Sequence, residues 1–189
     1  MQTNESSWLE KYLARYREIL SATDVFADLI RAKELLLAVK AEGRKLILAG
    51  NGASASIASH LAVDLTKQAG VRAVSFNEAN LITAFANDYG YDQWVLEAIR
   101  HHGRPGDVVI LISSSGRSPN MVAAGKFAVA EGFPLVTLSG FSPDNPLRTL
   151  GSVNLWVDSR AYNIVECTHM IWLTAICDLI IGTAEYPVS

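Results

Sequence analysis

The sequence predicts a doubly wound α/β domain, a three-layer αβα sandwich in which helices cover both faces of a parallel sheet. Five short apolar runs, bounded by glycine, proline or aspartate, alternate with longer segments of helical period. Strands buried on both faces of a parallel sheet have this continuous apolar character. The chain has 189 residues, half of them hydrophobic, which suits one compact domain. We therefore predict a single domain over residues 1–189.

Two helices are predicted before the sheet, within residues 1–42. Apolar residues recur on one face of residues 8–20, and a second helix, which we expect Asp24 to cap, runs down to Gly43. This pair could cover its own domain or pack against the same pair of another subunit. We favour contact with another subunit, because an exposed apolar surface of this size is rare on monomers.

Residues 43–189 are predicted to form the sheet and its right-handed crossover helices. The predicted strands are residues 45–49, 71–76, 108–112, 135–138 and 153–157. The predicted helices are residues 54–68, 80–85, 92–100, 119–131 and 161–181. No internal repeat or linker divides this region.

Charge and cysteine content narrow the classes of partner. Sixteen Lys and Arg residues against nineteen Asp and Glu residues, without a basic run, argue against direct nucleic-acid binding. Cys167 and Cys177 lack metal-type spacing and are predicted to be reduced core residues of a cytoplasmic protein. The N-terminus lacks the layout of a secretion signal, and no segment is expected to span a membrane. The predicted partners are a small molecule and further copies of the chain.

Two turns rich in small hydroxyl residues follow strands, at the sheet edge where parallel α/β proteins bind ligands. Residues 49–56 follow the first predicted strand and residues 113–118 the third. Each turn would present backbone N–H groups at a helix N-terminus, which favours phosphate. The first turn lacks the endings of a nucleoside triphosphate or dinucleotide loop, so we predict that both turns hold one phosphoester. The predicted binding residues are Asn51, Gly52, Ser54, Ser113, Ser114, Ser115 and Ser118.

Two further groups could carry proton chemistry. His60 and Asp64 lie four residues apart and so share one helix face, placed either for proton transfer on the ligand or as a plain surface pair. Glu166 and His169 lie in the apolar C-terminal segment. An isolated buried carboxylate is costly, so we assign Glu166 to a cleft, while His169 fits a core position and a site equally well.

Taken together, these blocks resemble the sugar isomerase (SIS) domain family, and within it the phosphoheptose isomerases. The resemblance covers nearly the whole chain. It is carried by Gly50-Asn51-Gly52-Ala53-Ser54, His60-Leu61-Ala62-Val63-Asp64-Leu65-Thr66, Asn87-Asp88-Tyr89-Gly90, Ser113-Ser114-Ser115-Gly116-Arg117-Ser118 and Val165-Glu166-Cys167-Thr168-His169. It implies a flavodoxin-like fold, a homotetramer with the N-terminal helices at its core, and active sites between subunits.

The resemblance also implies residue roles. The serines match the family's phosphate binders, Asp88 matches an acidic residue near the sugar, and Asp64 matches the base that moves a proton through an enediol. Three positions depart from the pattern: Asp64 is one methylene shorter than the family's glutamate, Glu166 replaces a glutamine, and Thr174 replaces the second catalytic histidine. Threonine cannot transfer protons near neutral pH as histidine does.

The same resemblance bears on metal, since some members bind zinc at these positions. His60, Asp64 and Glu166 could provide three ligands, an acceptable number for catalytic zinc. We therefore predict that zinc is possible but that no cofactor is required.

The predicted function is a phosphosugar aldose–ketose isomerase, converting sedoheptulose 7-phosphate to glycero-manno-heptose 7-phosphate with Asp64, His60 and Glu166 as its catalytic set. One alternative is a non-catalytic SIS protein that keeps the phosphosugar pocket and acts as a regulatory or protein-binding module, which the change at Thr174 would suit. Another is a different SIS chemistry, such as hexulose phosphate isomerisation.

Overall fold

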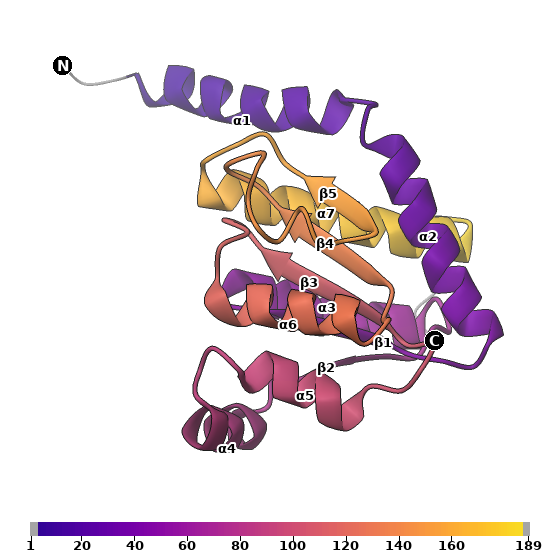
Figure 1. Cartoon of the computed structure of the whole chain (residues 1–189). Helices are drawn as coiled ribbons and strands as arrows, with labels where there is room; N and C mark the ends of the chain where they lie inside the picture. The colour runs from indigo at the N-terminus through magenta and orange to yellow at the C-terminus, as the bar shows by residue number, and fades with distance from the viewer. Residues whose placement is uncertain (1–3, 187–189) are drawn as a thin grey trace.

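A five-stranded parallel sheet forms the centre of the computed structural model, which describes residues 4–186 (Figure 1). The strands are β1 (Leu46–Gly50), β2 (Ala73–Ser75), β3 (Val108–Ser113), β4 (Leu135–Ser139) and β5 (Val153–Trp156). Their order is β2-β1-β3-β4-β5, and each neighbouring pair is parallel. This is the flavodoxin-like order, so the predicted doubly wound sheet is confirmed.

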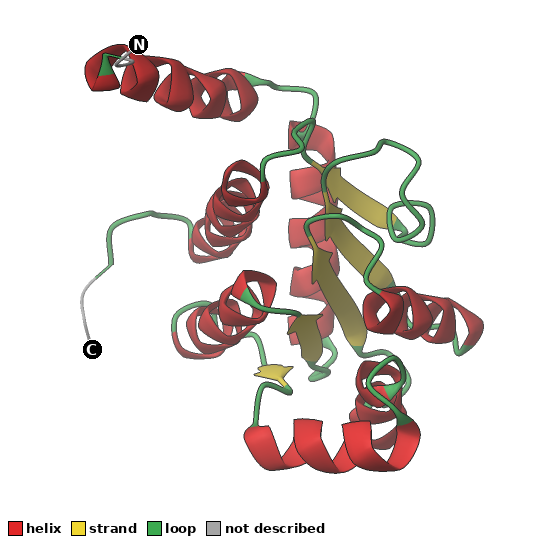
Figure 2. Ribbon diagram, turned by 90° about the vertical axis from the view of Figure 1, so that its left-hand side faces the viewer, coloured by secondary structure: helices red, strands yellow, loops and turns green. Residues whose placement is uncertain are grey.

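Helices cover both faces of this sheet (Figure 2). They are α1 (Glu5–Ser21), α2 (Phe26–Ala41), α3 (Ala53–Lys67), α4 (Ala79–Tyr89), α5 (Trp94–His102), α6 (Pro119–Ala130) and α7 (Tyr162–Ile181). Buried residues of α2, α3 and α7 form one apolar cluster with one face of the sheet, and those of α5 and α6 form a second cluster with the other face. The three layers expected from the sequence are therefore present.

The strand predictions hold best in the middle of the sheet. Every residue of β1, β3 and β4 is buried, as their continuous apolar runs indicated. The edge strand β2 is shorter than the predicted 71–76, and its three residues are partly or fully exposed. Val71 and Phe76 are buried just outside β2, so their apolar character reflects packing of the flanking loops.

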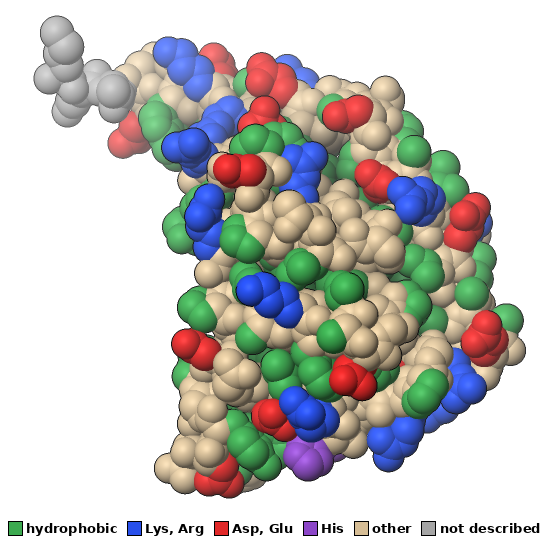
Figure 3. Space-filling model, viewed as in Figure 1, with side chains coloured by type: hydrophobic (Ala, Val, Ile, Leu, Met, Phe, Trp, Pro, Cys, Tyr) green, Lys and Arg blue, Asp and Glu red, His purple; other side chains and the backbone are tan. Residues whose placement is uncertain are grey.

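The N-terminal helices differ in how they pack. α2 buries Leu29, Ala32, Leu36 and Val39, whereas α1 has no buried residue and lies along the outside of the molecule, where its charged and apolar side chains are both visible (Figure 3). Asp24 does not cap α2 as we predicted. The helix begins at Phe26 and no side chain bonds to its first N–H groups.

α7 begins one residue later than predicted and ends at the predicted Ile181, but it is more apolar than we expected. By length and composition it could cross a membrane, with a mean hydropathy of 1.7, contrary to the expectation that no segment qualifies. It packs against α2 and α3, and it buries Ile164, Val165, Leu173 and Ile176. This packing accounts for part of its apolar composition, since 44% of its most apolar window is buried.

Candidate functional site

The two predicted loops meet where the sheet changes direction. β1 and β3 are neighbours, although β2 separates them in sequence, and their crossovers leave the sheet on opposite faces. Ligands of open α/β sheets bind in the crevice at such a switch point. The first loop, residues 50–52, leads from β1 into α3, and the second, residues 113–118, leads from β3 into α6.

Glycine shapes the first loop. A Cβ on Gly50 would lie 2.6 Å from the backbone carbon of Ser54, so only glycine lets α3 start so close to the end of β1. Gly52, at the N-terminus of α3, has a φ of 55°, which glycine adopts without strain. These two positions bring Ser54, which is buried, to the mouth of the switch point.

The second loop is a tight turn closed by its own bonds. The backbone N–H of Gly116 donates to the Ser113 carbonyl at 2.9 Å, and the Ser113 and Ser118 hydroxyls lie 3.1 Å apart. Gly116 has a φ of 63°, and a Cβ there would lie 1.9 Å from Oδ1 of the buried Asn145. No other residue fits this position without displacing Asn145.

A pair of amides joins the two loops. Asn51 Nδ2 donates to Asn120 Oδ1, and Asn120 Nδ2 donates to Asn51 Oδ1, both at 2.9 Å. Asn120 is 1% exposed and also accepts the backbone N–H of Met121. The loops after β1 and β3 are thus fixed relative to each other, and the Tyr91 hydroxyl adds a longer bond of 3.4 Å to Asn51.

A cavity of about 140 Å³, here called the serine pocket, lies between these loops. Six of the seven predicted binding residues line it; Gly52 is exposed beside it and does not. Its lining residues are Asn51, Ser54, Ile112, Ser113, Ser114, Ser115, Ser118, Tyr162 and Glu166. The N-termini of α3 and α6 both lie beside it, and their dipoles favour an anion.

Sequence reasoning missed three residues of this region. Tyr162 lines the serine pocket and makes an edge contact with Phe141, with ring centroids 4.8 Å apart. Phe141 has a φ of 60°, a conformation costly for a bulky side chain. Asn120 follows Pro119 in the sequence and resembled an ordinary helix start. The Asn51–Asn120 contact joins residues 69 positions apart, which no local pattern indicates.

Glu166 lies in the serine pocket, as its assignment to a cleft predicted. Its Oε1 accepts a hydrogen bond from the Ser114 hydroxyl at 3.2 Å. Asp88, in contrast, does not line the serine pocket. It is exposed near the C-terminal end of α4 and accepts a bond from Asn87 Nδ2 at 2.9 Å.

His60 and Asp64 form a pair on the outer side of α3. His60 Nε2 lies 3.1 Å from Asp64 Oδ2, and the two side chains are 54% and 24% exposed. Burial, with Asp64 and Asp178 nearby, raises the pKa of the Cys177 thiol to about 11. Asp64 is therefore close to α7, and the pair borders the junction of the two helices.

The candidate zinc ligands do not gather within one protomer. Over residues 4–186 no group of three His, Cys, Asp or Glu side chains is close enough to hold a metal ion. His60 and Asp64 bond to each other, while Glu166 bonds to Ser114. The predicted three-ligand set is thus not formed within residues 4–186 of one chain.

The structure also shows where the other predicted residues of α7 lie. His169 is a core residue: burial lowers its pKa to about 4, and its Nε2 donates to the Ser139 carbonyl at 3.1 Å. The Thr174 hydroxyl donates to the carbonyls of Met170 and Ile171, in its own helix. Cys177 is buried as predicted, but Cys167 is exposed, which corrects its assignment to the core.

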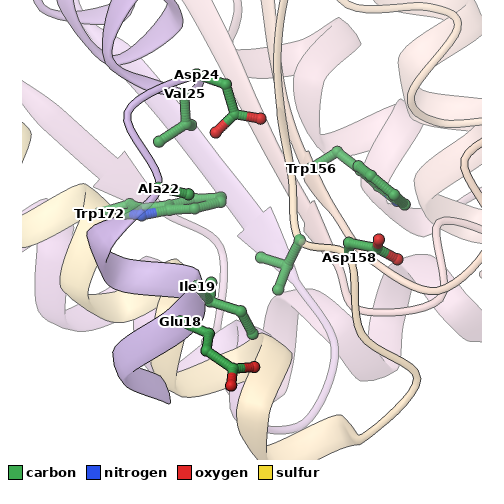
Figure 4. Close-up of a pocket in the computed structure, with 9 residues that line it drawn as sticks. Glu18, Ile19, Ala22, Asp24, Val25, Trp156, Asp158 and Trp172 are labelled. Carbon is green, nitrogen blue, oxygen red and sulfur yellow. The ribbon is translucent and has the colours of Figure 1, made fainter. Parts of the chain in front are cut away.

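A second cavity, of about 280 Å³, lies between the turn joining α1 and α2, the end of β5, and α7 (Figure 4). Trp172 and Ile19 give it apolar walls, and the carboxylates of Glu18, Asp24 and Asp158 surround it. None of the predicted site residues lines it. We therefore place the candidate site at the serine pocket and the neighbouring His60–Asp64 pair.

Known proteins are similar to this chain in sequence and in fold. The chain is 36% identical over 153 residues to the phosphoheptose isomerase of Colwellia psychrerythraea, covering 77% of this chain and 78% of the relative. It is 31% identical to the DnaA initiator-associating protein DiaA of Klebsiella pneumoniae, covering 87% and 88%. The structure of phosphoheptose isomerase GmhA from Neisseria gonorrhoeae superposes with a TM-score of 0.84 at 28% identity, covering 93% and 96%. The SIS domain model matches residues 11–140. The chain therefore belongs to the SIS domain family.

Proposed function

We propose that this protein is a phosphosugar aldose–ketose isomerase that converts sedoheptulose 7-phosphate to glycero-manno-heptose 7-phosphate through an enediol. The observation that carries the proposal is the joining of two serine-bearing loops, from neighbouring strands, around one pocket at the start of α3, the helix that also carries His60 and Asp64. The similarity to phosphoheptose isomerases over most of the chain supports the substrate.

The phosphoryl group would bind in the serine pocket. The two loops and the N-termini of α3 and α6 supply hydroxyl and N–H donors that suit its oxygens. His60 and Asp64 come six and ten residues after Ser54, so they lie about 9 and 15 Å further along the axis of α3. A triose phosphate is too short to cover even the shorter of these distances, so a longer phosphosugar is required.

The reaction moves protons only, so it needs no redox cofactor. Asp64 is the base that removes the proton from the carbon next to the carbonyl and returns it to the neighbouring carbon. His60, 3.1 Å away, orients Asp64 and exchanges a proton with the sugar oxygens. Thr174 takes no part, because its hydroxyl is bonded to its own helix.

The experiment that tests this function is an NMR screen of phosphosugars in deuterated water. Enolisation exchanges a proton on carbon 1 of a ketose phosphate, or on carbon 2 of an aldose phosphate, for deuterium, so it is detected even where net conversion is small. We expect exchange with sedoheptulose 7-phosphate and none with triose phosphates. No exchange with any six- or seven-carbon phosphosugar would refute the isomerase.

A non-catalytic, regulatory SIS protein is the second candidate. The hydroxyl of Thr174 is held by its own helix, which removes one proton carrier, and the similarity to DiaA over 87% of the chain supports this reading. Saturable phosphosugar binding without deuterium exchange would select it over the isomerase.

We also propose a homotetramer in which α1 lies at the interface. Trp8, Leu9 and Leu13 are each more than half exposed on α1, and Trp8 stacks on Tyr12 with centroids 5.1 Å apart. Burying such side chains between subunits is favourable. Light scattering should show that Leu13→Glu converts the assembly to smaller species, whereas Glu10→Gln on the same helix leaves it intact.

The proposed location is the cytoplasm. Cys167 and Cys177 are both free thiols in the structure, and free thiols persist in a reducing compartment.

A further inference from the structure

One acidic side chain, Glu166, faces the serine pocket. It lies one turn after the start of α7, and its Oε1 accepts the Ser114 hydroxyl proton at 3.2 Å. No Lys, Arg or His lines this cavity, and Glu166 forms no ion pair with any residue in the described part of the chain. A carboxylate without a counter-ion is therefore part of a cavity that is otherwise lined by hydroxyl and amide side chains and by Ile112.

This carboxylate restricts what can lie against it. An ionised carboxylate only accepts hydrogen bonds, and so does an ionised phosphoryl group. The two groups carry like charge, and their repulsion is stronger in a partly buried cavity than in water. A phosphoryl group is thus driven away from Glu166, toward the N–H groups at the starts of α3 and α6.

The part of the ligand that meets Glu166 must donate a hydrogen bond. In a sugar phosphate, the groups next to the phosphoester that can do so are hydroxyls. Ser114 has a single hydroxyl proton, which it already donates to Glu166 Oε1. A further hydrogen bond to this carboxylate must therefore come from the ligand. The contact therefore distinguishes ligands by what they carry beside the phosphoryl group.

We propose that Glu166 makes the serine pocket selective for phosphoesters that carry a hydroxyl beside the phosphoryl group, and that it disfavours phosphates without one. The inference rests on the proposed function, because it takes the serine pocket as the phosphoryl site. It adds the residue that sets selectivity there and the chemical class that is selected.

The test compares two probes, methyl phosphate and glycerol 3-phosphate, by isothermal titration calorimetry with the full chain. Wild type should bind glycerol 3-phosphate about 10-fold tighter or more, the effect of a hydrogen bond to a charged group. Glu166→Gln removes the charge but keeps an acceptor. It should reduce this preference by about 5-fold or more, mainly by tightening methyl phosphate. Glu166→Asp keeps the charge and should still bind methyl phosphate weakly.

Glu131→Gln, an exposed change at the end of α6, is the matched control and should leave the preference unchanged. An unchanged preference in Glu166→Gln, or equal weakening of both probes, would overturn the inference and leave the proposed function intact. If wild type binds neither probe, or if Ser118→Ala leaves both affinities unaltered, the serine pocket is not the phosphoryl site and both proposals fail.

Discussion

The serine pocket and the His60–Asp64 pair adjoin the same helix, yet the fold holds them in different ways. The pocket is assembled from buried groups: Ser54 is 3% exposed, and the Asn51–Asn120 amide pair locks its two loops together. His60 is 54% exposed, and within residues 4–186 its side chain bonds only to Asp64. The proposed binding end is thus enclosed by groups of one chain, whereas the proposed reactive end, the His60–Asp64 pair, lies open on the outer side of α3.

The largest expected effect comes from a substitution in the His60–Asp64 pair that leaves the serine pocket unchanged. Asp64→Asn removes the proposed base and should lower kcat for sedoheptulose 7-phosphate by about 10²–10⁴-fold, the usual contribution of a positioned acid–base group. Ligand affinity should change little, because the serine pocket is untouched. Steady-state kinetics and calorimetry measure the two effects separately.

The matched control is Asp178→Asn, which removes a carboxylate near Asp64 on the neighbouring helix α7. It should keep most of the turnover. Equal turnover by Asp64→Asn and wild type would show that Asp64 is not the base.

A substitution that distorts the serine pocket should, in contrast, weaken ligand binding. Gly116→Ala forces a left-handed φ on alanine and places a Cβ 1.9 Å from Asn145 Oδ1, so we expect a loss of about 3 kcal/mol in stability together with weaker phosphate binding. Urea unfolding and calorimetry measure these quantities. Gly132→Ala, which shares a positive φ but has open space at its Cβ, is the control for backbone strain alone. Equal losses in the two variants would contradict the role given to Asn145.

The same contrast explains what could be predicted from the sequence. Apolar runs and glycine-bounded loops predicted the layers of the sheet and placed Ser54 and Ser113 at one edge. Spacing of four residues predicted the His60–Asp64 contact, because a regular helix determines it. The Asn51–Asn120 pair and the Phe141–Tyr162 contact depend on tertiary geometry, which carries no local signal. Cys167 was misassigned because an apolar helix still has an outer side, which is where Cys167 lies.

The pH dependence of stability tests a third position, the buried His169 of α7. Burial lowers the pKa of His169 to about 4 from its usual 6.5, so the unfolded chain binds more protons between these values. The stabilising contribution is complete above pH 6.5 and is lost as pH falls toward 4, by about 3 kcal/mol in total. Urea unfolding from pH 4 to 7.5 should show that the free energy of unfolding rises less steeply with pH in His169→Gln than in wild type. His101 is exposed at the end of α5, so His101→Gln is the control and should keep the pH dependence of wild type. Parallel slopes in wild type and His169→Gln would contradict the assignment of a neutral core histidine.

The smallest expected effect comes from loosening the link between the loops. Asn120→Ala removes the partner of Asn51 Nδ2 and leaves Asn51 Oδ1 with only the longer Tyr91 bond, which should cost about 1–2 kcal/mol of stability. Phosphate affinity should fall, because the loops after β1 and β3 are no longer fixed relative to each other. The pH dependence of kcat should stay as in wild type, because the His60–Asp64 pair lies outside this link. Asn80 lies in the first turn of α4, and within residues 4–186 its side chain bonds only to Glu78, so Asn80→Ala is the matched control. A pH profile altered by Asn120→Ala would mean that the two regions are coupled, and that the buried end controls the open one.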